Sequence, residues 1–323
     1  MVVRHEGVKI VFFGTADFAC PSLLKLARHP SFRVVGVVTR PDHSKGRSVK
    51  PMPSPVKLLA LDLHCNVFQP ESLKSPAFLS QYKYLKADFN VVAAYGKILP
   101  RELLDFLRYG SFNIHGSLLP KYRGAAPIQR AMMDGCDETG VTVMKMDEGL
   151  DTGDVVLQQS THIRDTDNVQ TLHDRLAKLG SELIVEALGD VAANKAQFIP
   201  QNNKEASYAP KITRDDELIL WDTSKRRIWN QIRALYPGPG AYCYLQMEKG
   251  VKVVKLLVAD FERFVSGEAG FILKIDKEGI HVASQRGAVV IKEMQMEGKK
   301  KMSAAEFLRG CPLKVGQRFV SRV

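Results

Sequence analysis

Residues 8–39 read VKIVFFGTADFACPSLLKLARHPSFRVVGVVT, and this stretch decides the fold of the first part of the chain. Two short β-branched runs, at 8–13 and 33–39, flank a stretch at 17–28 that has helical character. Pro21 lies in the first turn of that stretch, where the missing N–H of proline costs nothing. The pattern predicts a strand, a helix and a second strand parallel to the first.

The same alternation continues beyond residue 39. An amphipathic helix begins near residue 169, behind a possible Asn168 cap, and is expected to close the domain. We predict a doubly wound, mostly parallel α/β sheet for a domain at residues 1–193. The further strands are expected at 89–93, 111–114, 140–146 and 155–163, and the further helices at 55–63, 72–84, 100–107 and 124–135.

The remainder of the chain has a different pattern. Residues 194–216 are polar and lack periodicity, and we place a linker at 194–208. A second domain at 209–323 is predicted to begin with a helix at 224–235 and to continue as a small OB-like β-barrel. Its strands are expected at 241–246, 251–258, 270–275, 279–283 and 288–291.

The charge of the chain is unevenly distributed. Of 323 residues, 46 are Lys or Arg and 35 are Asp or Glu, a net charge of +11. Residues 209–323 hold 21 basic and 13 acidic residues, whereas residues 1–208 hold 25 and 22. The excess favours an anionic partner for the second domain, with a surface merely tuned for solubility as the alternative.

Cysteine usage and hydropathy indicate the cellular compartment of the protein. The five cysteines are scattered, odd in number and without a CxxC pair, as expected of reduced thiols rather than disulfides or a zinc site. No apolar run approaches the roughly 20 residues that span a bilayer. We expect a cytoplasmic protein that is not bound to a membrane.

The sequence lacks the motifs of several common cofactor-binding and catalytic sites. The first turn reads FGTADF at 13–18 instead of G-x-G-x-x-G, so an NAD site is not expected and Gly14 is interpreted as a tight-turn glycine. G-x-S-x-G, H-E-x-x-H and Walker patterns are also missing, which gives hydrolase, zinc-protease and P-loop functions no support.

A long basic loop follows the second strand. Residues 40–57, RPDHSKGRSVKPMPSPVK, contain four prolines, five Lys or Arg and one acid. Loops of this length without secondary structure are usually functional or disordered. The net charge of +4 would suit phosphates, whereas a merely solvated loop is the alternative.

The densest polar segment is FNIHGSLLPKYRG at 112–124. Residues two apart in a strand point to the same face, so Asn113 and His115 should lie side by side while Phe112 and Ile114 face the core. Both polar groups then stand at the carboxyl end of a central strand, where open α/β sheets bind ligands. An amide can donate to a developing oxyanion, and an imidazole exchanges protons near neutral pH. We interpret the pair as functional rather than structural.

Four carboxylates follow about thirty residues later, at Asp147, Glu148, Asp151 and Asp154. One of them could hold the imidazole of His115 and manage a proton through water. Such clusters are often only solvated turns, and spacing alone does not select one acid. Without His or Cys at ligand spacing, a metal site is not expected here.

Together, six stretches resemble the methionyl-tRNA formyltransferases. The patterns Asn-x-His-x-Ser-Leu-Leu-Pro and Leu-Asp-Thr-Gly are shared by the wider folate-dependent formyltransferases, including those that act on a ribonucleotide or an amino sugar. The basic loop, GAAPIQRA and the basic C-terminal part favour the tRNA family. The stretches cover essentially the whole chain: FGTADFA (13–19), the loop at 40–57, AAYGKILP (93–100), NIHGSLLPKYRGAAPIQRAMMDG (113–135), TGVTVMKMDEGLDTGD (139–154) and YAPKITRDD (208–216).

The resemblance implies a reaction and a set of residues. A formyl group would pass from 10-formyltetrahydrofolate to the α-amino group of methionine on initiator tRNA, without metal or NAD, in a monomer. Asn113, His115 and Asp151 match the catalytic residues, which selects Asp151 from the four acids. The fold implied is a Rossmann-like formyltransferase domain at 1–193 and a tRNA-binding OB-like barrel at 209–323.

The resemblance also implies binding residues. A turn expected to contact folate consists of Ser117, Leu118, Leu119 and Pro120. The basic residues expected to bind tRNA are Lys45, Arg47 and Lys50. The sequence departs from the family pattern at two places. Ala16 stands where proline is commoner, and ALYPGPGAY at 234–242 differs from the commonest form of that segment, so the resemblance gives weaker support for tRNA contacts there.

Three other hypotheses remain open at this point. The nearest is a related folate-dependent enzyme that formylates an amino sugar or a nucleotide, which an acceptor comparison would reveal. A nucleic-acid-binding protein with an inactive transferase fold would tolerate loss of Asn113, His115 and Asp151. A two-domain NAD oxidoreductase would be stabilised by NAD rather than by folate.

Overall fold

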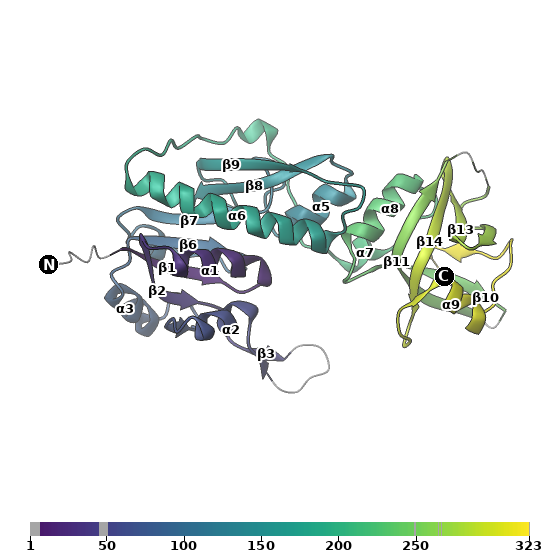
Figure 1. Ribbon diagram of the computed structural model, residues 1–323, viewed down its shortest axis with the longest axis horizontal. Helices are drawn as coiled ribbons and strands as arrows, with labels where there is room; N and C mark the ends of the chain where they lie inside the picture. Colours follow the sequence, from purple (N-terminus) through teal and green to yellow (C-terminus); the bar gives the residue numbers. More distant parts are fainter. Residues whose placement is uncertain (1–6, 45–50, 249, 264, 266, 323) are drawn as a thin grey trace. The chain divides into compact units, whose positions relative to one another are not determined.

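The structure is a computed structural model that describes residues 7–44, 51–248, 250–263, 265 and 267–322. The chain forms two compact units, and Figure 1 shows their elements. The first unit consists of the chain up to Pro127 together with Thr139–Thr161 and His173–Ala209. The second consists of Ile128–Glu138, His162–Leu172 and Pro210–Val323.

A seven-stranded sheet forms the centre of the first unit, in the order β5-β2-β1-β6-β7-β8-β9. The pairs β2–β5, β1–β2, β1–β6 and β6–β7 are parallel, and β7–β8 is antiparallel. Because the sheet grows outward on both sides of β1, the predicted doubly wound, mostly parallel sheet is confirmed. The strands are β1 (Val8–Gly14), β2 (Phe32–Val38), β5 (Val67–Phe68), β6 (Phe89–Ala93), β7 (Gly110–His115), β8 (Glu138–Lys145) and β9 (Val155–His162).

Helices pack against both faces of this sheet. Figure 1 shows α1 (Cys20–Arg28) and α6 (Val169–Ala192) across one face. A Cβ added to Gly180 of α6 would lie 2.7 Å from Ile114 Cγ2, so a glycine is needed for this close approach. On the other face, the Tyr82 hydroxyl donates to Asn90 Oδ1 over 3.1 Å. Strands buried on both faces explain why their sequences read as continuous apolar runs.

Two helices of the first unit begin at a serine cap followed by proline. The Ser54 hydroxyl accepts from the Lys57 N–H before α2 (Pro55–Asp62), and Ser75 does the same for Phe78 before α3 (Pro76–Tyr84). The cap at Ser75 places the start of α3 four residues later than the predicted 72. The helix expected at 100–107 is one turn only, α4 (Arg101–Leu104).

The segment at 194–208 is part of the first unit and hydrogen-bonds to its other elements. It contains one short 3-10 helix, η2 (Asn203–Glu205). Ile199 pairs with Val155 in an antiparallel bridge, and Tyr208 pairs with Arg123 in a parallel one. This segment therefore runs beside the start of β9 and the loop that follows β7.

The second unit is built on an antiparallel sheet, in the order β12-β13-β14-β11-β10-β16, with β15 beside β14. This curled sheet bears out the predicted OB-like barrel, and the helix predicted at 224–235 is α8 (Lys225–Ala234), capped by Ser224. The other elements are α5 (Pro127–Met133), which lies almost wholly in this unit, α7 (Arg214–Glu217), β10 (Ala241–Met247), β11 (Gly250–Glu262), β12 (Ile272–Asp276), β13 (Gly279–Ser284), β14 (Gly287–Met296), β15 (Met302–Ser303), α9 (Ala304–Gly310) and β16 (Phe319–Val320).

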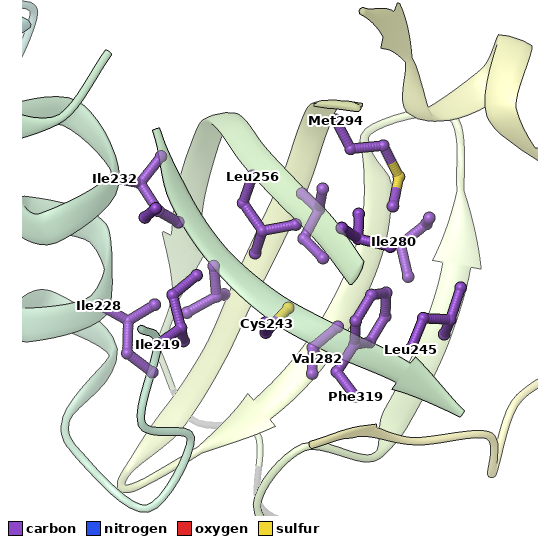
Figure 2. Packing of buried hydrophobic residues seen from close by; sticks show 14 of the residues in the cluster. Ile219, Ile228, Ile232, Cys243, Leu245, Leu256, Ile280, Val282, Met294 and Phe319 are labelled. Atoms are coloured by element: carbon purple, nitrogen blue, oxygen red, sulfur yellow. The ribbon is translucent and has the colours of Figure 1, made fainter. Parts of the chain in front are cut away.

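The core of the second unit lies between α8 and the concave side of this sheet. Figure 2 shows Ile228 and Ile232 of α8 facing Cys243, Leu256 and their neighbours on the strands. Burial raises the pKa of the Cys243 thiol, so this cysteine acts as a small apolar core residue. Within the described ranges, no helix of the chain has the length and hydrophobicity to cross a membrane.

Candidate active site

Asn113 and His115 stand at the carboxyl end of β7, as their spacing predicts. Their neighbours Phe112 and Ile114 are buried on the opposite face. The His115 side chain is itself only 6% exposed, so its ring is held almost entirely by protein atoms. A parallel strand end thus presents an amide and an imidazole at the edge where α/β sheets bind ligands.

Asp151 completes the group from the loop between β8 and β9. Its Oδ2 lies 3.6 Å from His115 Nδ1, and its Oδ1 accepts from Asn113 Nδ2 over 3.4 Å. The same Oδ2 accepts from the Gly124 N–H over 2.8 Å. Asp151 has φ +54°, a left-handed conformation that aspartate tolerates better than most residues. The structure therefore brings together all three residues that were predicted to be catalytic.

The neighbouring acids have other partners. Asp147 Oδ1 accepts from the Gly149 N–H over 2.9 Å and from Thr152 Oγ1 over 2.7 Å. A carboxylate oxygen of Glu148 lies 3.5 Å from Arg101 Nε. Asp147 stabilises the turn and Glu148 pairs with α4. The selection of Asp151 therefore depends on how the loop folds back toward β7.

The second nitrogen of His115 determines where its proton can move. Nε2 lies 2.9 Å from the carbonyl oxygen of Tyr122. Because a carbonyl only accepts, Nε2 carries a hydrogen and donates it. Nδ1, which faces Asp151, is then the atom that can exchange a proton with a substrate or a water.

Hydrogen bonds within the first unit hold the turn at 117–120, which was predicted to contact folate. Ser117 Oγ donates to the Lys121 carbonyl over 2.6 Å, and Gln158 Nε2 donates to the Leu119 carbonyl over 2.7 Å. Ser117 and Leu119 are buried, whereas Leu118 and Pro120 are partly exposed. Leu118 and Pro120 are therefore the accessible side chains of this turn, whereas Ser117 and Leu119 lie inside it.

The turns that follow β1 and β6 meet at the same edge. Thr15 Oγ1 donates to the Tyr95 carbonyl over 3.1 Å. A Cβ on Gly14 would lie 2.9 Å from Ala19 Cβ, in keeping with its interpretation as a tight-turn glycine. Burial raises the pKa of Tyr95 to about 12, so its hydroxyl is neutral at physiological pH.

A cavity of about 420 Å³ opens beside the loop that carries Asp151. Ser111, two residues before Asn113 on β7, and Met146, at the start of the loop, both line it. Its rim carries both signs of charge, including Arg101 and Glu148. In the described part of the chain, no three His, Cys, Asp or Glu side chains are placed to hold a metal ion.

The basic loop is described only in part. Lys45, Arg47 and Lys50, the residues predicted to bind tRNA, lie outside the described residues. Of the other two bases, Arg40 donates to the Gly96 carbonyl, and Lys57 Nζ pairs with Asp42 over 2.6 Å.

The sequence did not predict the role of the segment at 201–207, which hydrogen-bonds to the loops that carry the site. The Tyr122 N–H donates to Ser207 Oγ over 2.9 Å, and the Arg123 N–H donates to the Ser207 carbonyl over 2.8 Å. Gln201 reaches the loop of Asp151 from the same segment. These residues lie in a stretch that showed only polarity, so no signal in the sequence distinguished them.

Comparisons with known proteins identify the family of the chain. Residues 8–188 match the formyl transferase family, and residues 211–312 match the formyl transferase C-terminal domain. A methionyl-tRNA formyltransferase of Methylacidiphilum infernorum is 44% identical over 310 residues, covering 96% of this chain and 97% of the relative. One of Dictyoglomus thermophilum is 43% identical over 317 residues, covering 97% and 100%.

Solved structures show the same fold at lower identity. An N-formyltransferase of Helicobacter canadensis, in complex with folinic acid and dTDP-3-aminofucose, has a TM-score of 0.63 at 19% identity and covers 90% of this chain and 99% of its own. At this identity the similarity supports the fold alone. The relatives that match along nearly the whole chain are named as enzymes that formylate methionyl-tRNA. The chain belongs to the methionyl-tRNA formyltransferase family.

Proposed function

We propose that Asn113, His115 and Asp151 carry out the transfer of a formyl group from 10-formyltetrahydrofolate to the α-amino group of methionyl initiator tRNA. Membership of the family means that the protein formylates methionyl-tRNA with a formyl-tetrahydrofolate. The assignment of residues to the steps is our own. The observation that carries it is the meeting of an amide, an imidazole and a carboxylate around one point at the carboxyl edge.

The chemistry needs charge stabilisation and a proton path. As the amine nitrogen bonds to the formyl carbon, negative charge builds on the formyl oxygen before the bond from that carbon to the folate nitrogen breaks. The Asn113 Nδ2–H and a proton on His115 Nδ1 would donate to that oxygen, each contributing about 2–4 kcal/mol. Asp151 would orient Nδ1 and accept the proton that leaves the amine, directly or through a water, and pass it toward the departing folate nitrogen.

The folate co-substrate fits the surroundings of the triad. The carboxyl edge that carries Asn113 and Asp151 also carries the turns that follow β1 and β6, and ligands of open α/β sheets bind at this edge. Leu118 and Pro120 offer apolar contact from the neighbouring turn. We propose that the folate binds at this edge, with its formyl group directed toward Asn113 and Asp151.

The tRNA would bind through basic segments outside the triad. The basic loop has a net charge of +4 and residues 209–323 have +8, so both can neutralise phosphates. We propose that Lys45, Arg47 and Lys50 contact the acceptor arm. We propose catalysis in the domain at 1–193, a linker at 194–208, tRNA binding in the domain at 209–323, and action as a cytoplasmic monomer.

Substitution of the triad tests this proposal. We expect His115→Ala and Asp151→Asn to lower kcat by at least about 10²-fold, because each removes a group that acts on the developing charge or its proton. Affinity for methionyl-tRNA, measured by filter binding, should stay close to wild type. Asp147→Asn is the matched control, because Asp147 lies in the same loop but only stabilises its turn.

The outcomes are distinct. If the two triad variants lose tRNA binding as severely as turnover, they report misfolding of the site, and the assignment fails. It fails equally if Asp147→Asn and Asp151→Asn have the same kcat.

A further inference from the structure

We propose that Gln201 is a positioning residue for Asp151, held in orientation by the buried Arg123. This inference rests on the proposed catalytic role of Asp151. Gln201 lies far from the triad in the sequence, in the segment that follows α6. Its Nε2 donates to two backbone carbonyls of the catalytic loop, that of Asp151 over 2.9 Å and that of Gly153 over 2.7 Å.

The loop that Gln201 holds is tight. Asp151 has φ +54°, a conformation that costs a non-glycine residue free energy unless its surroundings maintain it. A Cβ on Gly153 would fall 1.7 Å from the Lys145 carbonyl oxygen, so the chain turns there in direct contact with β8. The amide of Gln201 bridges the carbonyls on either side of Thr152 and so fixes the turn that aims the carboxylate of Asp151.

Arg123 fixes which way the Gln201 amide points. The Arg123 side chain donates to Gln201 Oε1 from Nε over 3.1 Å and from Nη2 over 2.8 Å. A guanidinium only donates and a carbonyl only accepts, so the oxygen of Gln201 must face Arg123 and its NH₂ must face the loop. Arg123 is 2% exposed, and the Asn203 Oδ1 also accepts from Nη2 over 2.8 Å. The amide therefore has one favourable orientation.

Through its hydrogen bond to the carbonyl of Asp151, Gln201 is connected to the reacting atoms. Asp151 Oδ2 lies 2.8 Å from the Gly124 nitrogen and 3.6 Å from His115 Nδ1, and both distances depend on where the backbone of residue 151 is held. A small displacement of this backbone misaligns the carboxylate. Loss of the Gln201 amide should accordingly lower kcat and leave the KM for methionyl-tRNA nearly unchanged.

The Gln201→Glu substitution tests the two functions of the side-chain amide separately, because it keeps the acceptor for Arg123 and removes the donor to the loop. The carboxylate keeps the acceptor for Arg123 and adds an ion pair, but it places an oxygen without hydrogen against two carbonyl oxygens. We expect kcat to fall by about 10–100-fold, with KM for methionyl-tRNA within about twofold of wild type. When the carboxyl group is protonated it again has one O–H to donate, so the ratio of variant to wild-type kcat should rise as the pH is lowered.

Asn202→Ala is the matched control. Asn202 is the next residue, is exposed, and its side chain hydrogen-bonds within its own segment, accepting from the Lys204 N–H and donating to Glu205 Oε1. Its variant should keep the wild-type kcat. If Gln201→Glu does not fold, as judged by circular dichroism, Gln201→Met supplies a side chain of similar length without hydrogen bonds and should show the same loss of kcat.

Two results would overturn the inference. One is a Gln201 variant that folds and turns over at the wild-type rate while Asp151→Asn is slow, which refutes the positioning role but not the triad. The other is a loss of kcat in Gln201→Glu that is the same at every pH and matched by Asn202→Ala, which would mean a general structural defect. A fast Asp151→Asn enzyme would instead refute the proposed function itself.

Discussion

Gly124 offers a sharp test of how the loop after β7 holds the site. It has φ +119°, and a Cβ there would lie 2.9 Å from the Ala209 carbonyl oxygen. Alanine would therefore be strained by its conformation and would also push against backbone that cannot rotate away. The N–H of Gly124 is the donor to Asp151 Oδ2, so the same displacement reaches the carboxylate.

The Gly124→Ala substitution should lower both stability and turnover. An unfavourable backbone conformation costs about 1–3 kcal/mol, which for a unit of this size lowers Tm by about 2–4 °C for each kcal/mol. Misplacement of the carboxylate should reduce kcat by about 10–100-fold. Thermal unfolding followed by circular dichroism and steady-state formyl transfer at saturating methionyl-tRNA measure the two effects.

Gly189→Ala is the matched control for this experiment. Gly189 lies within α6, is exposed, and has no atom within 4 Å of an added Cβ. Alanine there should stabilise the helix by about 0.5–1 kcal/mol and leave kcat unchanged. The reasoning is refuted if Gly124→Ala melts at or above the wild-type Tm, or if it destabilises the protein and its kcat nevertheless stays at the wild-type value.

Two further predictions concern the charged segments. Arg47→Ala should weaken tRNA binding and reduce the slope of log K against log salt by about 1, as measured by filter binding at several salt concentrations; an unchanged slope would exclude a phosphate contact. In the second unit, Lys274 and His281 hold the pKa of Asp276 well below its usual range, so the ionised form stabilises the fold above the unfolded-state pKa and this contribution is lost as the pH falls. Asp276→Asn should thus lower Tm at neutral pH, with the difference from wild type shrinking below about pH 4; a constant difference would contradict it.

The first unit was largely predictable because its signals are local. Runs of β-branched residues predict strands, and a spacing of two on a strand puts Asn113 and His115 on one face. The choice of Asp151 was not available from spacing. It depends on a left-handed turn and on the Gly124 N–H, which is distant in the sequence, and only the fold brings these together.

Other features were missed for different physical reasons. Gln201 has no periodicity around it, and its role depends on Arg123, 78 positions earlier in the chain. β16 has only two residues, Phe319–Val320, and is a strand because β10 pairs with it. The helix α9 did carry a signal, a capping box between Ser303 and Glu306, that could have located it.

The central claim is that the carboxylate of Asp151 acts with Asn113 and His115 in formyl transfer to methionyl initiator tRNA. Single-turnover transfer of a radiolabelled formyl group from 10-formyltetrahydrofolate, with wild type and Asp151→Asn on methionylated initiator and elongator tRNAs, tests it most directly. The account predicts fast transfer by wild type to the initiator tRNA and a rate at least about 10²-fold lower for Asp151→Asn at unchanged tRNA affinity. Transfer by Asp151→Asn at the wild-type rate, or a wild-type enzyme that formylates a nucleotide-linked amino sugar faster than either tRNA, would contradict it.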